Sequence, residues 1–298
     1  MKIIISGGRG FVGQNLLKKM KKEGFEMQEI TVIDKKMDDG FCQKLGVNFL
    51  MADLAEKDDW QKIFQDQEIM IILHAQIASL ESKDFYFNNV KATENVIEAA
   101  KRYGIKKTIY LSSAAVLSSR EDDYAKTKKQ GEEIVKNSGL LSVIIRPSII
   151  YGPGDQKNIG WLINFAKKWP IFPIPGHGRY PRQPIYVEDL CQIIINLIRN
   201  FPSESRVYNI NGKEKINFDQ MVKTVLKELK GIHLVIYLPI PIFLFLLKIY
   251  DFLFRSPFTS DQIKSLISGD IFPDYPWWEE FDIKPTPFSE GIKKIIKQ

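Results

Sequence analysis

The feature that most constrains this chain is a glycine-rich turn near the N-terminus, set between an apolar run and an amphipathic pattern. It reads KIIISGGRGFVG, so Gly7, Gly10 and Gly13 keep the spacing G-x-x-G-x-x-G. After a buried strand, the first two glycines let the backbone turn tightly and approach a pyrophosphate, and the third lets a helix pack closely on the strand. The first N–H groups of that helix then face the phosphates. The pattern therefore predicts a dinucleotide-binding βαβ unit.

An acidic residue stands where such a unit binds the adenosine ribose. Asp34 closes the apolar run ITVID, 21 residues beyond Gly13. A carboxylate at that point accepts hydrogen bonds from both ribose hydroxyls and repels a 2′-phosphate, so NAD is favoured over NADP. Lys35 and Lys36 follow directly and would soften this preference.

The first half of the chain alternates short apolar runs with segments of helical period. This alternation predicts a parallel sheet covered by helices on both faces, a doubly wound α/β fold of the Rossmann type. The predicted strands are 2–6, 29–34, 47–51, 69–73, 108–112 and 142–146. The predicted helices of this half include 13–22, with Gly24 as its C-terminal cap, and 89–102.

The composition of the sequence changes after Arg146. Residues 151–184 are rich in proline, glycine and aromatic side chains, which predicts mostly loop with a short helix near 161–168. Regular structure is expected to return as a helix at 187–198, a strand at 206–210 and a helix at 218–230, with Asn217 and Gln220 as a capping pair. We assign 1–150 plus about 185–212 to the dinucleotide-binding domain, and 151–184 plus 213–298 to a smaller substrate-binding lobe.

Composition narrows the classes of function. Two cysteines, Cys42 and Cys191, cannot build a disulfide framework, and they fit a cytoplasmic protein. Three scattered histidines without an H-x-x-x-H pair argue against a catalytic metal. The net charge of +6 suits a phosphorylated small molecule or an anionic lipid; nucleic acid is disfavoured because the lysines are spread rather than clustered with aromatic residues.

One apolar stretch, 232–254, resembles a membrane segment in composition alone. Pro239 and Pro241 would interrupt a spanning helix, and Lys248 and Asp251 shorten the apolar run below the roughly 20 residues that a bilayer requires. Two interpretations stay open: a segment that is buried or covers a substrate, which we favour, and an anchor on a membrane surface.

The segment EDDYAKTKKQGEE carries the candidate chemistry. Tyr124 and Lys128 are four residues apart and share one face of a predicted helix. A lysine ammonium close to a tyrosine favours the phenolate, which can take a proton from a substrate hydroxyl or return one to a carbonyl. Ser113 follows the fifth predicted strand, so its hydroxyl is expected at the same sheet edge; Ser112 is an alternative.

Further motifs follow in a fixed order along the chain: NNVKATENVIEAA, IYLSSAAVL, YAKTK, RPSIIYGPGD, RQPIYVEDL and VYNING. Together with SGGRGFVG they resemble the extended short-chain dehydrogenase/reductases, the nucleotide-sugar epimerase/dehydratase family, over nearly the whole length. The resemblance implies NAD as cofactor and a nucleotide-diphosphate sugar as substrate. It also implies a homodimer built from the helices after the fourth and fifth strands.

The resemblance also implies roles for single residues, with Ser113, Tyr124 and Lys128 as the catalytic set. The residues expected to line the cofactor are Gly7, Gly10, Phe11, Val12, Gly13, Asp34, Asp53, Leu54, Ala75, Asn89, Tyr124 and Lys128. Those expected to contact the substrate are Ser113, Gln76, Asn158 and Arg182. Of these, Arg182 would grip the diphosphate, a task for which a guanidinium fork is well suited.

Three departures from the family pattern bear on the reaction. Only ten residues separate Ser113 from Tyr124, which shortens the loop between them. Gln76 stands where the family prefers a small residue. Ala114 and Ala115 follow Ser113 where the dehydratases carry an acid pair, so dehydration is disfavoured, and decarboxylation with it.

The remaining alternatives share hydride transfer without elimination. The favoured function is epimerisation of a nucleotide sugar at C4 through a transient 4-keto sugar. The second is an NAD(P)H-dependent reductase or dehydrogenase, acting on a 4-keto sugar nucleotide or on a hydrophobic alcohol of the 3β-hydroxysteroid kind. A non-catalytic NAD(P)-binding accessory subunit is a third possibility, of another class.

Overall fold

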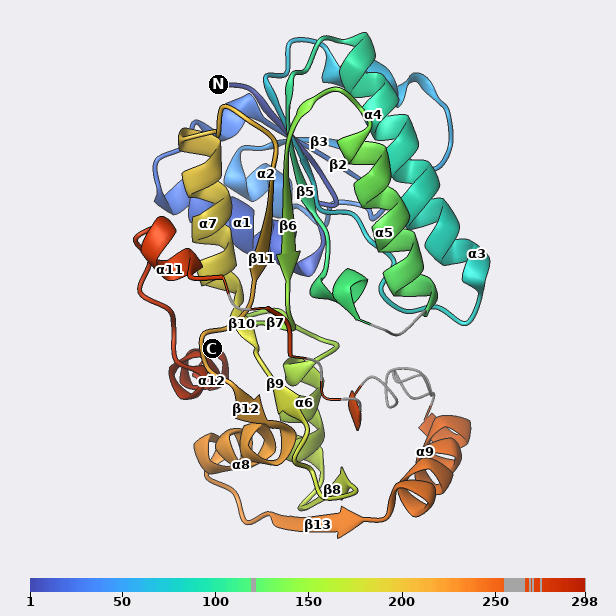
Figure 1. Ribbon diagram of the computed structural model, residues 1–298, viewed down its shortest axis with the longest axis vertical. Helices are drawn as coiled ribbons and strands as arrows, with labels where there is room; N and C mark the ends of the chain where they lie inside the picture. The colour runs from blue at the N-terminus through green and yellow to red at the C-terminus, as the bar shows by residue number, and fades with distance from the viewer. Residues whose placement is uncertain (119–121, 255–265, 268, 270, 274, 298) are drawn as a thin grey trace. The chain divides into compact units, whose positions relative to one another are not determined.

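The computed structural model describes residues 1–118, 122–254, 266–267, 269, 271–273 and 275–297 (Figure 1). The chain divides into two compact units, each built from three separate segments. Unit 1 comprises Met1–Pro147, Glu188–Ile210 and Asp274–Ile283. Unit 2 comprises Ser148–Val187, Asn211–Pro273 and Lys284–Gln298.

Unit 1 is built on a seven-stranded parallel sheet of order β11-β6-β5-β4-β1-β2-β3. Its strands are β1 (Ile3–Ser6), β2 (Ile30–Asp34), β3 (Asn48–Met51), β4 (Ile69–Ile72), β5 (Lys107–Leu111), β6 (Leu141–Pro147) and β11 (Arg206–Ile210). Strands β1, β2 and β4 are buried along their whole length, as isoleucine-rich strands covered on both faces should be. The prediction of a doubly wound parallel sheet is confirmed.

Helices cover both faces of this sheet, with α4 and α5 on one face and α1 and α7 on the other (Figure 1). The helices of unit 1 are α1 (Phe11–Lys22), α2 (Phe41–Leu45), α3 (Ser82–Phe85), α4 (Ala92–Arg102), α5 (Asp123–Lys136), α7 (Val187–Arg199, whose first residue belongs to unit 2) and α11 (Trp277–Glu280). Short helical turns lie at η1 (Met27–Glu29), η2 (Asp59–Phe64) and η4 (Ala114–Leu117), and a π-helical segment, η3, at Tyr86–Lys91.

The order in which strands are added to the sheet reverses at β1: β2 and β3 lie on one side of it, and β4, β5, β6 and β11 lie on the other. In open parallel sheets, ligands bind beyond the carboxyl ends of the strands at such a switch point. The glycine-rich turn follows β1 directly, and α1 begins at Phe11. Gly24 has a φ of 79° just beyond the end of α1, which agrees with its predicted role as a cap.

Unit 2 has three pairs of short strands and four helices in its described part. The strand pairs are β7 (Ile150–Tyr151) with β10 (Ile185–Tyr186), β9 (Pro181–Arg182) with β12 (Ile216–Asn217), and β8 (Ile171–Pro175) with β13 (Leu234–Leu238). The helices are α6 (Ile159–Lys168), α8 (Phe218–Leu229), α9 (Ile240–Phe254) and α12 (Phe288–Ile296). The ring of Tyr151 packs against Tyr186 at 5.5 Å and Phe288 at 5.1 Å in the core of this unit.

Two expectations about this half of the chain need correction. Residues 151–184 are not mostly loop: β8 is a five-residue strand that contains Pro173 and Pro175. Those prolines are compatible with a strand here because β8 pairs with one neighbour only, β13. In addition, 274–283 belongs to unit 1 rather than to the lobe. Trp277 is buried there, and the amide of Asn196 on α7 donates to the Phe281 carbonyl at 3.0 Å.

The apolar stretch 232–254 forms β13 and α9, and the expectation that it is buried is wrong for much of it. Phe245 is 64% exposed and Ile232 is 98% exposed. Within the described ranges, no helix combines the length and the apolar character that crossing a bilayer demands.

Candidate functional site

The turn after β1 is as tight as its glycines predict. Gly7 has a φ of 75°, and a Cβ there would lie 2.5 Å from the backbone nitrogen of His74. A Cβ on Gly13 would lie 2.5 Å from the Cα of Gly8, so α1 packs directly on the turn. Gly10 donates its N–H to the Gly7 carbonyl at 3.0 Å. Phe11 and Val12 are the first residues of α1. A backbone cradle that faces a helix N-terminus fits a pyrophosphate.

The Asp34 carboxylate is held in place by backbone donors. It is 8% exposed and accepts the N–H of Arg9 on Oδ2 and that of Lys36 on Oδ1, both at 2.9 Å. An ionised carboxylate has about four lone-pair positions, so it can still accept from two ribose hydroxyls. The Lys35 ammonium donates to Asn88 Oδ1 at 2.5 Å. These residues fit the adenosine ribose of NAD.

Arg9 is a part of this site that the sequence did not single out. Its guanidinium lies 2.6 Å from Asp39 and 3.3 Å from Asp38, and 5.1 Å from the centre of the Phe41 ring. The side chain is largely buried, so it fastens the segment after β2 to the glycine-rich turn. The available signal was an arginine between the glycines together with an acidic pair shortly after Asp34.

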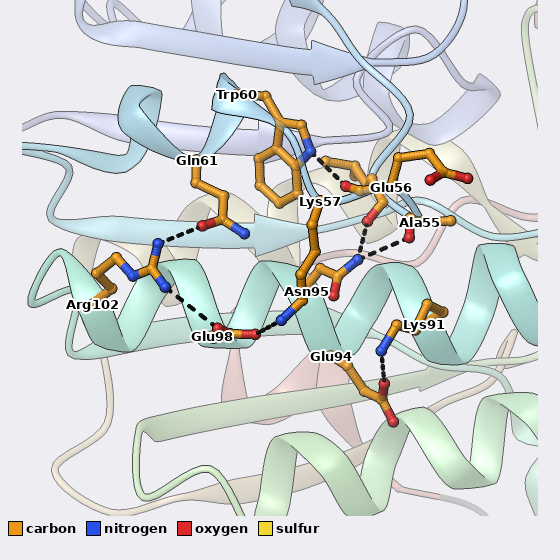
Figure 2. A network of polar contacts seen from close by, with 11 residues as sticks. Ala55, Glu56, Lys57, Trp60, Gln61, Lys91, Glu94, Asn95, Glu98 and Arg102 are labelled. Atoms are coloured by element: carbon orange, nitrogen blue, oxygen red, sulfur yellow. Dashed lines mark hydrogen bonds and ion pairs between the residues drawn. The ribbon is translucent and has the colours of Figure 1, made fainter.

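The loop that contains Asp53 and Leu54, both expected to line the cofactor, is fastened to α4 (Figure 2). The buried amide of Asn95 donates to the carbonyls of Leu54 at 2.9 Å and Ala55 at 3.0 Å. The Asp53 side chain accepts the Ala55 N–H at 2.9 Å, which closes the turn. At the edge of the network, Lys57 pairs with Glu98 at 2.9 Å. The position of this loop therefore depends on a helix residue, Asn95, that the sequence analysis missed.

Asn89 clamps the segment after β4 instead of only lining it. Its Oδ1 accepts the Gln76 N–H at 2.7 Å, and its Nδ2 donates to the Gln76 carbonyl at 3.0 Å and to Thr127 Oγ1 at 3.0 Å. Thr127 is part of α5, so this one amide joins Gln76 to the helix of the candidate chemistry. Ala75, just before Gln76, is exposed. Asn89 lies in the π-helical segment, a deviation often found at functional sites.

His74 is a neutral imidazole beneath the glycine-rich turn. Ser6 Oγ lies 2.8 Å from Nδ1 and Thr93 Oγ1 lies 3.2 Å from Nε2. The Thr93 hydroxyl donates to the Asn89 carbonyl at 2.8 Å, so it accepts from His74, which assigns the proton to Nε2. Burial, assisted by the positive charges of Lys128 and Lys35, lowers the pKa of His74 to about 3.

The structure brings Ser113, Tyr124 and Lys128 to one end of the sheet in unit 1. Helix α5 begins at Asp123, with the Asp122 side chain accepting the Ala125 N–H at 2.8 Å as its N-cap. Tyr124 and Lys128 lie one turn apart on this helix, and the Ser113 side chain is close enough to Tyr124 to act on the pKa of its phenol. The three predicted residues are therefore placed for joint action on one substrate oxygen.

Ser112 is committed elsewhere, which favours Ser113 as the substrate-facing hydroxyl. Ser112 Oγ donates to Glu132 Oε1 at 2.6 Å. Glu132 is 1% exposed, and Arg146 binds both of its oxygens, through Nε at 2.8 Å and Nη2 at 2.5 Å. Glu132, one turn beyond Lys128, was not predicted, although Y-x-x-x-K-x-x-x-E is visible in the sequence.

The electrostatics of the pair differ from the expectation that Lys128 lowers the pKa of Tyr124. Burial lowers the pKa of Lys128 to about 7, and the Glu132 charge opposes this shift only in part. The Lys128 Nζ donates to the Leu111 carbonyl at 2.7 Å and lies 4.2 Å from the Tyr110 ring centre. Burial raises the pKa of Tyr124, and the Ser113 side chain works in the opposite direction. The lysine amine thus points toward strand β5. The main influence on the pKa of Tyr124 is burial, not the charge of Lys128.

The two remaining predicted substrate residues belong to unit 2. Arg182 is 3% exposed on β9, and its guanidinium donates to the carbonyls of Pro181 at 3.1 Å and Leu266 at 2.5 Å. Asn158 is exposed just before α6. The neighbouring Asp155 accepts the N–H groups that start this helix, including that of Gly160 at 3.0 Å.

Known proteins resemble this chain along nearly its whole length. The UDP-glucose 4-epimerase of Vibrio cholerae is 23% identical over 99% of this chain and 94% of its own length. The 3beta-hydroxysteroid-dehydrogenase/decarboxylase isoform 2 of Arabidopsis thaliana is 25% identical over 98% of this chain, and the chain spans 61% of that relative.

A solved structure shows the same fold. It is a UDP-glucose 4-epimerase from Thermotoga maritima with UDP-glucose, which superposes with a TM-score of 0.79 at 18% identity, covering 100% of this chain and 98% of that one. The family model for the NAD dependent epimerase/dehydratase family matches residues 3–211, from β1 to just past β11. This span includes the glycine-rich turn, Asp34 and the helix of Tyr124 and Lys128. The chain belongs to the NAD-dependent epimerase/dehydratase family, a family of enzymes.

Proposed function

We propose that this protein is an NAD-dependent epimerase of a nucleotide-diphosphate sugar, acting at C4 through a transient 4-keto sugar. The observation that carries the proposal is the gathering of Ser113, Tyr124 and Lys128, with alanines at 114 and 115 where elimination would need an acid. The coverage of the Vibrio cholerae UDP-glucose 4-epimerase, 99% of this chain and 94% of that protein, supports epimerisation over its alternatives.

The cofactor would be held by the backbone at Gly7, Gly10 and Gly13 and by the Asp34 carboxylate. The remaining assigned contacts are Phe11, Val12, Asp53, Leu54, Ala75, Asn89, Tyr124 and Lys128. When bound, NAD supplies a positive ring that favours the phenolate and a carbon that stores the hydride between its removal and its return.

The residues of the chain manage the proton and the orientation of the sugar. Tyr124 Oη takes the proton from the C4 hydroxyl and later returns it to the 4-keto oxygen. Ser113 hydrogen-bonds the same sugar oxygen and keeps it beside the phenol. We assign Lys128 to exchange a proton one helical turn from Tyr124. Its pKa of about 7 means that both the charged and the neutral amine are present at neutral pH.

Substrate contacts outside unit 1 are assigned to Arg182 and Asn158, with Gln76 beside the sugar in unit 1. The guanidinium of Arg182 would bind the diphosphate, because its planar donors match two phosphate oxygens. The exposed side chain of Asn158, just before α6, would donate to a phosphate oxygen.

The test is to incubate the purified protein with UDP-hexoses and with dTDP-4-keto sugars, with and without added NADH or NADPH. We expect UDP-hexose epimers to interconvert without net change in the cofactor. Tyr124→Phe should lower kcat by about 10²–10⁴-fold, because the proton carrier is lost. Tyr103→Phe, at the end of α4, is the matched control and should leave kcat unchanged.

Other outcomes separate the alternatives. Stoichiometric cofactor consumption would overturn the epimerase in favour of a reductase or dehydrogenase, and turnover of a 3β-hydroxysteroid would identify a hydrophobic alcohol as the substrate. The similarity to the Arabidopsis thaliana protein supports that second candidate. Bound nucleotide without activity on any of these compounds would indicate an accessory subunit.

A further inference from the structure

Unit 2 exposes apolar side chains on three adjacent elements, the start of β8, β13 and α9, here together called the apolar face. Its most exposed members lie on β13, on α9 and just before β13: Ile232, Leu234, Ile242, Phe245, Leu246 and Ile249, between 42% and 98% exposed. Surfaces of this kind mark sites of contact with another molecule or a membrane, because isolated soluble proteins rarely expose apolar side chains side by side.

The three elements are neighbours, because β13 pairs with β8 and α9 packs against β8. Leu234 lies opposite Ile171 in the parallel register of β13 and β8, and its N–H donates to the Pro170 carbonyl at 2.8 Å. Helix α9 follows β13 and contacts β8 (Figure 1). Trp169, 45% exposed, directly precedes this pairing.

Helix α9 is apolar on two sides. Ile242, Phe245, Leu246 and Ile249 follow one helical face, at spacings of three, four and seven residues from the first, and all four are exposed. Leu244 and Leu247, between them, are half-buried. A surface helix of a soluble domain normally turns polar side chains outward, whereas α9 offers a second apolar face.

The surroundings of the apolar face are basic. The two stretches that contribute to it, 156–187 and 229–254, contain one acidic residue, Asp251, and they include the exposed Lys167, Lys168, Lys230 and Lys248. On the adjacent α8, Asp219 is paired with Lys223 at 3.0 Å. Such a rim attracts anionic lipid headgroups. It would repel an identical rim in a two-fold contact between copies of this chain.

The dimensions favour a helix that lies along a bilayer surface. Fifteen residues of α9 extend about 22 Å, less than the roughly 30 Å of a hydrocarbon core. Trp169 and Tyr237, each 45% exposed, are the residue types that anchor proteins at the headgroup level. We propose that the apolar face docks on an anionic phospholipid membrane, with α9 in the interface plane and the lysine rim against the headgroups. This inference goes beyond the proposed epimerase activity and does not depend on it.

The first test measures sedimentation of the full chain with vesicles of phosphatidylcholine alone or phosphatidylcholine containing phosphatidylglycerol. Binding is expected to be about tenfold stronger to the anionic vesicles and to weaken as salt is added. The double variant Phe245→Glu, Leu246→Glu should lose this binding while still binding NAD, since both side chains are exposed and can be changed without disturbing a core. Leu80→Glu, at a 97% exposed leucine of unit 1, is the matched control and should bind like the unchanged chain.

A second measurement locates the contact. Trp169 fluorescence should shift to the blue with anionic vesicles and be quenched by lipids brominated near the headgroup, and Trp169→Phe should remove this response. The proposal is overturned if anionic vesicles do not bind the chain, or if Leu80→Glu impairs binding as much as the double variant. It is also overturned if light scattering shows that the double variant dissociates a dimer, which would assign the apolar face to a second copy. Because no readout uses turnover, failure here is distinguishable from failure of the epimerase proposal.

Discussion

Three ionisable side chains, the half-buried His74 and the buried Lys128 and Glu132, carry most of the electrostatic consequences of this site. Hydrogen bonds within the protein hold each of them in place. His74 bonds to Ser6 and Thr93, Lys128 to the Leu111 carbonyl, and Glu132 to Ser112 and Arg146. None of them depends on a ligand for its place. Their effects on stability and on pH dependence can therefore be predicted separately.

His74 should make the protein acid-sensitive. Its pKa is lowered from 6.5 to about 3, so between these values the unfolded chain binds a proton that the folded chain does not, and stability falls as the pH falls. From pH 6.5 to 5 the loss should approach about 1.5 kcal/mol, before most carboxylates titrate. Urea unfolding of His74→Gln should show a flatter pH dependence over this range. His177→Gln, at an exposed histidine, is the control, and an equally steep slope in His74→Gln would contradict the assignment.

Glu132 should act as a positioning residue for Lys128. Glu132→Gln removes the charge that raises the lysine pKa, so the limb of the kcat pH profile that reports Lys128 should move to lower pH. It also weakens the bonds to Ser112 and Arg146, at a cost of about 1–3 kcal/mol in the free energy of unfolding.

Glu133→Gln is the control, since it makes the same substitution at the next residue of the helix. Glu133 is 54% exposed, and in the described contacts it pairs only with the surface Lys136. It should change neither quantity. A purely structural role for Glu132 would show as lost stability with an unmoved pH profile.

At the scale of elements, the cofactor site is assembled by helix residues that fasten loops. Asn95 fastens the loop after β3, and Asn89 fastens the segment after β4. Both asparagines are 1% exposed on neighbouring turns of one continuous helical run, so one helix sets the position of two loops.

Asn95→Leu should therefore weaken NAD binding without touching the glycine-rich turn. It leaves two carbonyls of the 54–55 turn without their donor, a loss of about 1–3 kcal/mol; passed in full to NAD binding, this loss corresponds to roughly 5- to 150-fold in Kd. Calorimetric titration with NAD measures this directly. Lys57→Ala removes an exposed ion pair of the same network and should have little effect. Equal Kd values for both variants would show that the loop does not need Asn95.

The sequence was informative where local chemistry decides the structure. Apolar strands, the glycine-rich turn and the capping pair of α8, in which the Asn217 N–H donates to Gln220 Oε1 at 3.0 Å, were all predictable from neighbours in the chain. The π-helical segment at Tyr86–Lys91 was not, since local sequence does not report the contacts that Asn89, inside it, makes with Gln76 and Thr127 elsewhere in the chain. Strand β8 was missed because Pro173 and Pro175 normally argue against a strand, and only the pairing with β13 explains them.

The residues proposed as catalytic, Ser113, Tyr124 and Lys128, could be singled out for the same reason, since they lie in short motifs. Their electrostatics were not. The lysine pKa of about 7 comes from burial against Tyr110 and Leu111, and no spacing rule reports burial. The exposure of α9 was likewise hidden, because an apolar composition does not distinguish a core helix from one that faces outward.

For the whole molecule, we expect a homodimer formed through the helices after the fourth and fifth strands. A groove of about 630 Å³ lies between η3, α4 and α5 in unit 1. Its lining includes Tyr86, 46% exposed, and Ile134, together with lysines and glutamates that can pair across a two-fold axis.

Light scattering should report a dimer for the unchanged chain and a monomer for Tyr86→Glu with Ile134→Glu, since two buried charges would face each other at the contact. Lys101→Glu, elsewhere on α4, should remain dimeric. A monomeric unchanged chain would end this expectation without affecting the fold.

The alternation of segments between the two units has a consequence for biosynthesis. Two elements of unit 1, β11 and α11, follow Ser148–Val187, the first segment of unit 2, in the sequence. A nascent chain that has emerged only as far as residue 200 still lacks β11, one of the two neighbours of β6, so β6 is an unpaired edge strand at that stage. Unit 1 is therefore complete only after residues 275–283 have been made, and fragments cut after Pro147 or after Ile210 should aggregate rather than fold.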